Sequence, residues 1–323
     1  MIITLTANPS LDRTVTLGSA LVPGGVHRIE TDQIQPGGKG INVAFGVQRA
    51  GIDTLAVFQS APDDPLLELL AQSGLPCRTS PISGRVRTNI TLLGEGVTTK
   101  VNEPGQRLSA QEIEGLERAL IEAVGPNDTV MLSGSLAPGF DDDEYARLVR
   151  MVRDKGAWVG VDTSDAPLVA LAAEFETSAP DFIKPNAEEL GQLTGRDGVE
   201  LEAAAGRGDV DAVRDAALAL REQGVREVLV TLGGAGAVLA TSEGVWFAPP
   251  IKVPVISTVG AGDSATAGYL IAKTQGLSGP ECLAYATAYG STAVSLPGTT
   301  IPRPDQVHPD PDAVRELKGH QNV

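Results

Sequence analysis

The chain has 323 residues, 42% of them hydrophobic and 20% charged, which fits one large α/β domain. Its formal net charge of −16 argues against non-specific nucleic-acid binding, because that needs a basic surface. No run of eighteen apolar residues and no signal-peptide pattern is visible, so a cytoplasmic protein is expected. The only two cysteines, Cys77 and Cys282, lie far apart in the sequence and are expected to be buried thiols.

Strands and helices alternate along most of the chain. Apolar strand patterns occupy 2–6, 53–60, 128–134, 157–163, 181–185 and 226–234. Helical patterns occupy 38–50, 63–74, 109–124, 142–156, 186–195, 210–224, 262–275 and 280–295. This alternation predicts a mainly parallel central sheet that is covered by helices on both faces.

Two strand-like segments, 26–35 and 86–93, have no helix of their own. In the second, Arg87 and its alternate neighbours form a polar face, which suits a small sheet laid across a ligand. A solvated edge strand explains the same pattern equally well. Residues 196–210 are small and polar and are interpreted as a surface excursion, and 303–323 as a frayed tail.

Residues 258–268, "TVGAGDSATAG", contain a glycine-rich entry to a helix followed at once by an acid. The order of elements around this loop does not fit a dinucleotide-binding loop, since no strand precedes the acid expected about 20 residues further on. The "PGGKG" segment likewise fails the P-loop pattern. A helix N-terminus that binds a phosphoryl group, with Asp263 facing the attacking hydroxyl, explains both the glycines and the acid. Histidine chemistry is disfavoured because only His27, His308 and His320 are present.

Several motifs together resemble the PfkB/ribokinase family of sugar kinases. The resemblance rests on "STVGAGDS", "KPNAEEL" and "PGGKGINVA", and is extended in order by "TANPSLDRT", "TKVNEPG", "SGSLAPG" and "VTLGGAGAV". It covers residues 1 to about 300, and the pairing of "NPSLD" with "GGKGINVA" is most similar to the hexose-phosphate branch. The resemblance implies a ribokinase-like three-layer α/β/α sandwich, one kinase domain over 1–323, with lid strands at about 12–35 and 84–102.

The resemblance also implies the roles of the residues. Asp263 is the expected general base, and Gly260, Ala261 and Gly262 form the anion hole for the transferred phosphoryl. The helix N-terminus is expected to keep the pKa of Asp263 low.

On the nucleotide side, Lys184 is expected to approach the phosphates of ATP. Asn186 and Glu189 are expected to help hold Mg²⁺, largely through water, although an ordinary acid in a first helical turn explains Glu189 too. Thr231, Gly233 and Gly236 are expected around the phosphates and ribose of ATP.

On the sugar side, Asp12 and Asn42 match the family's hydroxyl-binding positions, and Gly37 and Gly38 allow close approach. Arg28, Lys39 and Arg87 are the candidates for the substrate's own phosphate, because arginine and lysine suit phosphate; a structural salt bridge is the alternative for Arg28.

The expected reaction is ATP-dependent phosphorylation of the 6-hydroxyl of fructose 1-phosphate. Tagatose 6-phosphate and fructose 6-phosphate remain alternative acceptors, and a non-catalytic sugar-phosphate sensor is an alternative of another class. No nucleic-acid or membrane partner is expected, and a homodimer through the lid is.

Overall fold

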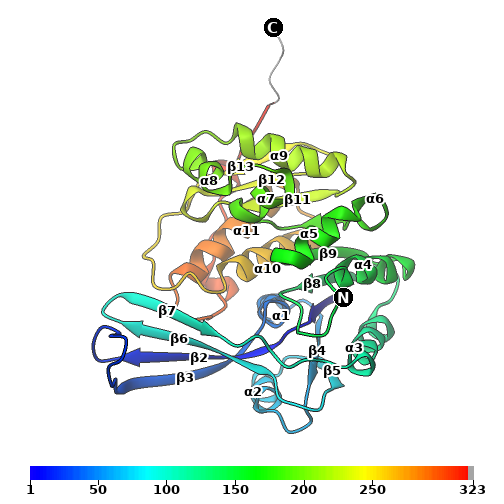
Figure 1. Ribbon diagram of the computed structural model, residues 1–323. Helices are drawn as coiled ribbons and strands as arrows, with labels where there is room; N and C mark the ends of the chain where they lie inside the picture. The colour runs from blue at the N-terminus through cyan, green and yellow to red at the C-terminus, as the bar shows by residue number, and fades with distance from the viewer. Residues whose placement is uncertain (319–323) are drawn as a thin grey trace.

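The computed structural model describes residues 1–318 and consists of a large sheet with helices on both faces and a smaller sheet projecting from one side (Figure 1). The large sheet holds ten strands, seven of which run parallel to one another, so the predicted fold class is confirmed. In spatial order the strands are β14 (Arg315–Glu316), β13 (Val245–Ala248), β12 (Ala237–Ala240), β11 (Glu227–Thr231), β10 (Phe182–Ile183), β9 (Trp158–Asp162), β8 (Thr129–Ser133), β1 (Ile2–Thr6), β4 (Thr54–Ser60) and β5 (Cys77–Pro81).

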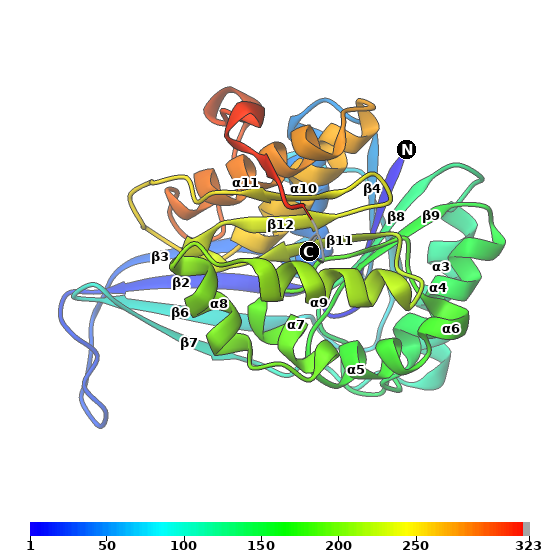
Figure 2. The ribbon, with the colours of Figure 1, turned by 90° about the horizontal axis from the view of Figure 1, so that it is seen from above.

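The helices cover the two faces of this sheet in two groups, as the view from above shows (Figure 2). One face packs against α1 (Lys39–Arg49), α2 (Pro65–Ser73), α10 (Ala261–Thr274) and α11 (Gly279–Val294). The other packs against α3 (Ala110–Ala123), α4 (Glu144–Asp154), α5 (Asp165–Ala173), α6 (Phe175–Ser178), α7 (Ala187–Thr194), α8 (Gly198–Gly206) and α9 (Asp211–Glu222). Three short 3₁₀ turns accompany these helices: η1 (Gly233–Ala235), η2 (Pro304–Gln306) and η3 (Pro311–Ala313).

The central strands are apolar on both sides because both sides are covered. All five residues of β1 are buried, and β9 is buried from its second residue to its end. Local signals set the helix ends: Ser109 and Glu112 form the predicted capping box of α3, and Gly74 ends α2 in the left-handed conformation.

The small sheet, here called the lid, has the strand order β3 (Ile29–Gly37), β2 (Ser10–Leu17), β6 (Arg87–Gly94) and β7 (Val97–Asn102). Since β6 lies between β2 and β7, the alternative that it is a solvated edge strand is wrong. Strand alternation gives the lid two different faces. A polar row crosses one face and a more apolar row the other: respectively Gln35, Asp12, Asn89 and Asn102, and Ile34, Arg13, Ile90 and Val101.

The polar face of the lid is directed toward the main body. The hydroxyl of Thr299, beyond α11, donates to Oε1 of Gln35 at 3.1 Å. The polar lid face therefore borders the space beside the large sheet, and the apolar face points away from it.

Three expectations are corrected by the structure. Residues 196–210 are not a surface excursion: Asp197 caps α8, whose Leu201, Ala204 and Ala205 are buried. The predicted fraying of the tail is wrong for residues 303–318, because β14 pairs with β13 and Leu317 is buried. Residues 319–323 of that prediction lie outside the described residues. Cys77 is exposed on the edge strand β5, whereas Cys282 is buried as expected.

No helix within residues 1–318 is long and apolar enough to cross a membrane.

Candidate active site

The predicted site residues gather at the carboxyl edge of the large sheet, where open parallel sheets usually bind their ligands. Thr6, Ser133 and Asp162 end β1, β8 and β9 in register with one another. Lys184 directly follows β10, and α1 and α10 begin beside the same edge. Segments from six parts of the chain thus meet in one place.

Asp263 lies in the first turn of α10 and is only 7% exposed. Its Oδ2 accepts a hydrogen bond from Nδ2 of Asn42 at 2.8 Å, so two residues 221 positions apart meet here. Burial raises the pKa of Asp263 to about 6, although Lys39 and Lys184 act in the opposite direction. The expectation of a low pKa is therefore wrong: the loss of water around the carboxylate outweighs the helix N-terminus.

The glycine-rich loop gives α10 an unusual entry. Gly260 is the N-cap with φ of 78°, a left-handed conformation that glycine adopts without strain. The first amides of α10 have no partner within the helix, so they are available to an anion. Ala261, between the two glycines in the sequence, is the first residue of α10. A Cβ at Gly262 would lie 3.3 Å from Nζ of Lys184, so this lysine lies directly against the loop.

Lys39 and Lys184 are joined by Asp162, a residue that the motif analysis did not single out. Nζ of Lys39 donates to Oδ1 of Asp162 at 3.0 Å, and Nζ of Lys184 lies 3.2 Å from Oδ2. Burial alone would raise the pKa of Asp162, but the two ammonium groups hold it below its ordinary value. The available signal was an acid at the end of the buried strand "WVGVD".

Asp12 lies on the polar face of the lid, where Ser10 and Asn89 donate to its Oδ1 at 2.8 and 3.1 Å. A Cβ at Gly37 would lie 2.4 Å from the carboxylate carbon of Asp12, so glycine is needed beside this side chain. Gly38, the N-cap of α1, has φ of 113° and lies beside Thr6. At both glycines a side chain would collide with a neighbour, so glycine allows Asp12 and the start of α1 to pack closely here.

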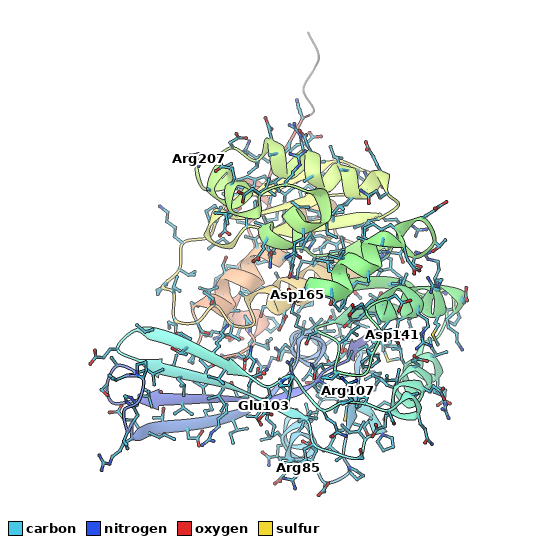
Figure 3. The ribbon with its side chains drawn as sticks, viewed as in Figure 1. Arg85, Glu103, Arg107, Asp141, Asp165 and Arg207 are labelled. Carbon is cyan, nitrogen blue, oxygen red and sulfur yellow. The ribbon has the colours of Figure 1, made fainter. Side chains whose placement is uncertain are left out.

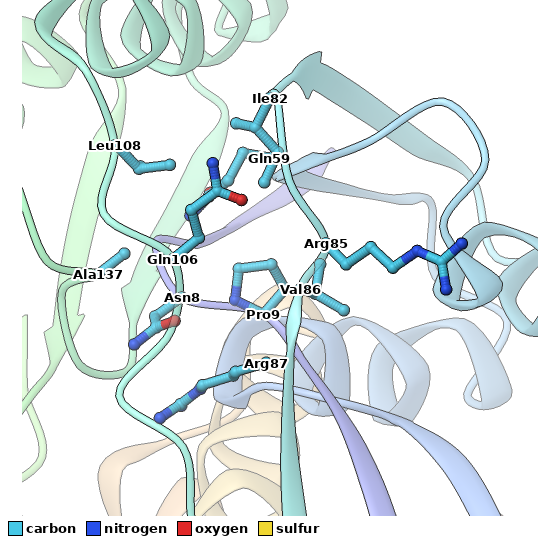
Figure 4. Close-up of a pocket in the computed structure, with 10 residues that line it drawn as sticks. All are labelled: Asn8, Pro9, Gln59, Ile82, Arg85, Val86, Arg87, Gln106, Leu108 and Ala137. Carbon is cyan, nitrogen blue, oxygen red and sulfur yellow. The ribbon is translucent and has the colours of Figure 1, made fainter.

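Arg87 reaches from the lid to the segment after β8, where its Nη2 lies 3.5 Å from Oγ of Ser135. Its Nε is buried and has no partner among the described residues. Figure 4 shows Arg87 beside Asn8 at one side of a small cavity, and Arg85, which also lines it, with its guanidinium directed away from the other labelled side chains. The cavity of about 10 Å³ has the size of one water molecule, so it is not itself a sugar site.

The three expected phosphate-binding cations do not all converge. Lys39 and Arg87 flank the segment of Gly134 and Ser135. Arg28 is exposed and precedes the far end of β3, and nine residues of strand separate it from the site, roughly 30 Å at 3.3 Å per residue. The structure therefore does not bring Arg28 to the site of its own chain.

The predicted nucleotide residues lie together beside Lys184. Asn186 and Glu189 form a reciprocal capping box at the start of α7, with N–H to oxygen distances of 2.9 and 2.8 Å. Asn186 also forms a β-bridge with Thr231. The tight turn η1 comes shortly after Thr231; it begins at Gly233, with φ of 53°, and Gly236, with φ of 105°, is its C-cap.

Comparisons with known proteins agree with this geometry. Residues 6–306 match the family described as pfkB family carbohydrate kinase. The chain is 34% identical to a 1-phosphofructokinase of Rhodobacter capsulatus over 316 residues, which cover 95% of this chain and 94% of that protein. It is also 34% identical to a 1-phosphofructokinase of Xanthomonas campestris over 295 residues, 89% of each chain. The crystal structure of Escherichia coli phosphofructokinase-2 with substrates and products has a TM-score of 0.84 at 29% identity, covering 94% of this chain and 96% of that one.

The fold and the site define a ribokinase-like carbohydrate kinase, and the chain belongs to the pfkB family. Within that family it is a sugar-phosphate kinase, a phosphotransferase that acts on a sugar hydroxyl. The resemblance inferred from the motifs is thereby confirmed.

Proposed function

We propose that the protein transfers the γ-phosphoryl group of ATP to the 6-hydroxyl of fructose 1-phosphate, forming fructose 1,6-bisphosphate and ADP. The observation that carries this proposal is the buried Asp263, held by Asn42 at the entry of α10 and faced by Lys39 and Lys184. The names of the bacterial relatives support fructose 1-phosphate as the acceptor. Tagatose 6-phosphate and fructose 6-phosphate are the alternative acceptors.

In this proposal Asp263 accepts the proton of the 6-hydroxyl as the hydroxyl oxygen attacks phosphorus. Asn42 fixes one carboxylate oxygen by its hydrogen bond, which directs the other toward the sugar. The amides of Gly260, Ala261 and Gly262 stabilise the charge on the oxygens of the transferred group. Proton acceptor and anion-binding amides come from one helix start, so their separation is fixed by the backbone.

The sugar is proposed to lie between the lid and the carboxyl edge of the sheet. Asp12 accepts hydrogen bonds from sugar hydroxyls, and Gly37 and Gly38 let the ring approach the backbone. Arg87 binds the phosphate that the substrate already carries, because its Nε is buried without a partner and its guanidinium is a forked donor. Arg28 is not proposed to bind substrate in its own chain, since it lies at the far end of the lid.

ATP is proposed to lie along Lys184, Thr231, Gly233 and Gly236. For Mg²⁺, the structure offers the carboxylate of Glu189, of which only Oε2 is engaged by the cap, with Asn186 beside it. No group of three or more acidic, histidine or cysteine side chains set to hold a metal occurs in residues 1–318. This donor set fits Mg²⁺ held mainly by phosphate oxygens and water, and bound there the ion would neutralise phosphate charge.

The proposal is tested by measuring ADP release with fructose 1-phosphate, fructose 6-phosphate, tagatose 6-phosphate and ribose. We expect the highest kcat/KM with fructose 1-phosphate; a higher value with another sugar would overturn the assignment of the substrate. Arg87→Ala is expected to raise KM for the sugar phosphates. The matched control is Arg85→Ala, because Arg85 is 68% exposed on the same segment and its guanidinium is directed away from Arg87.

We further propose a homodimer formed through the apolar face of the lid, and a cytoplasmic location, where ATP is available. Ile34 and Val101 on that face are half-exposed in the single chain. Sedimentation should give twice the chain mass of 33.4 kDa, and Val101→Lys should shift the protein toward monomer. A wild-type monomer at working concentration would contradict this assembly.

A further inference from the structure

Asp162 is the most deeply buried charged group at the carboxyl edge of the sheet among the described residues, with 1% of its side chain exposed. Its two oxygens face two different ammonium groups: Lys39 comes from the start of α1, and Lys184 from the end of the neighbouring strand β10. Lys184 is 5% exposed and Lys39 36% exposed. One carboxylate therefore connects a helix and a strand that border the site from different sides.

The arrangement is more than one structural ion pair. A buried carboxylate is costly unless it is paired, and a single lysine would be enough to pair it. Here two lysines share one carboxylate, so the group of three carries a net positive charge. Lysine side chains are long and flexible, and two ammonium groups repel each other; the carboxylate between them is what keeps them together.

The positive charge of this group adjoins the anion-binding loop. Nζ of Lys184 would lie 3.3 Å from a Cβ at Gly262. The negative charge of Asp263 raises the pKa of Lys39, so this ammonium group is also near the start of α10. We propose that Asp162 is a positioning residue that holds the ammonium groups of Lys39 and Lys184 around the phosphoryl group in transfer. This inference rests on the proposed phosphoryl transfer and extends it, because it assigns Lys39 to the transferred group rather than to the substrate's own phosphate.

The proposal has a second consequence, for the proton acceptor. The charged groups that face Asp263 are Lys39 from α1, Asp162 from β9 and Lys184 after β10. The charge of Asp162 raises the pKa of Asp263, while the two lysines lower it. If Asp162 holds the lysines, its replacement by Asn lets both move away, and the lowering effect that is lost exceeds the raising effect of Asp162, because the effect of Lys39 alone is the larger. The acid limb of the pH–activity profile should therefore shift to higher pH, whereas loss of the Asp162 charge with the lysines still in place would shift it to lower pH.

The test compares Asp162→Asn with Asp181→Asn, using whichever sugar phosphate the wild type turns over fastest. Asp181 is a matched control, because it is also buried and ion-paired, with Arg226 at 2.9 Å, but precedes β10 at the opposite edge of the sheet. We expect Asp162→Asn to lower kcat roughly 10²-fold and to shift the acid limb to higher pH. The folded Asp181→Asn protein should keep the wild-type kcat and pH profile.

A double-mutant cycle with Lys39→Met keeps the proposal falsifiable if Asp162→Asn folds poorly. Because Asp162 acts through the lysines, removing it should cost at least fivefold less in kcat when Lys39 is already absent. Additive effects would overturn the proposal, and so would an acid limb in folded Asp162→Asn that is unchanged or shifted to lower pH. If the wild type releases no ADP with any of the sugars, the proposed function itself fails, which is a separate outcome.

Discussion

Replacing Asp263 by Asn is expected to stabilise the fold while it removes the proposed proton acceptor. Burial raises the pKa of Asp263 from the ordinary 3.8 to about 6. A difference of about two pH units between the folded and unfolded states corresponds to ~3 kcal/mol at neutral pH. For a chain of this length, that free energy corresponds to roughly 4 °C in Tm. The same substitution, Asp263→Asn, should lower kcat about 10²- to 10⁴-fold.

The gain in stability has a defined pH dependence. Below about pH 4, the carboxyl group is protonated in both the folded and the unfolded state, so the substitution has no effect through charge. Between about pH 4 and 6, only the unfolded state ionises freely, and the wild type loses stability as the pH rises. Urea unfolding at pH 5 and pH 8 should therefore show a gain about half as large at pH 5.

The same substitution at Asp181 should have the opposite sign. Asp181 is buried too, but its carboxylate pairs with Arg226 at 2.9 Å and accepts the N–H of Val159 at 2.9 Å. Asp181→Asn is therefore expected to lose stability. If Asp263→Asn lost stability at pH 8 as well, the argument that desolvation dominates at Asp263 would be refuted.

Three further outcomes follow from single positions. Since only ionised Asp263 accepts a proton, kcat/KM should rise with pH and level off above about pH 6, and a profile flat down to pH 4.5 would contradict this. Gly37→Ala puts a methyl group 2.4 Å from the carboxylate carbon of Asp12, and steady-state kinetics should show a roughly tenfold higher KM for the sugar phosphate with KM for ATP unchanged. Asp165, at the start of α5 (Figure 3), has φ of 58°; Asp165→Gly should add about 1 kcal/mol of stability in urea unfolding, which Asp165→Ala should not.

The parts of the fold that could be predicted from the sequence depend on local rules. Hydrophobic periodicity located six of the seven parallel strands of the large sheet and eight of the eleven α-helices described, and the pairing of Ser109 with Glu112 located the start of α3. Alternation along 86–93 separated the polar face of the lid from the apolar one before the partner strands were known. Helix α8 differs from its prediction because Gly198, Gly206 and Gly208 are typical of loops, whereas the capping Asp197 and the alanines between the glycines form a helix.

The parts of the site that could not be predicted depend on distances between remote segments. Nothing local to "WVGVD" reveals that Lys39 and Lys184 face the acid at its end, because the three residues meet only through the sheet and α1. The pKa of Asp263 likewise depends on burial by the whole domain, which outweighed the helix N-terminus visible in the sequence. The position of Arg28 likewise could not be predicted, because it depends on the length of β3, which places Arg28 far from the site of its own chain.

The spacing of Asn186 and Glu189 is explained by structure and by function at once. Their capping box accounts fully for a separation of three residues, yet it engages only one oxygen of the Glu189 carboxylate. Glu189→Gln separates the two roles, because glutamine can still accept the N–H of Asn186 but carries no charge. We expect the stability to change by less than about 0.5 kcal/mol, and the Mg²⁺ concentration for half-maximal activity to rise about fivefold or more.

The control for this substitution is Glu281→Gln in the corresponding capping box of α11, where Glu281 accepts the N–H of Ser278 at 2.8 Å. This cap lies at the start of another helix, and Glu281 is not among the proposed nucleotide residues. Its loss of charge should therefore leave the Mg²⁺ dependence of ADP release unchanged. If the two variants showed the same Mg²⁺ dependence, Glu189 would act as a helix cap alone, and Mg²⁺ would depend on phosphate oxygens and water without it.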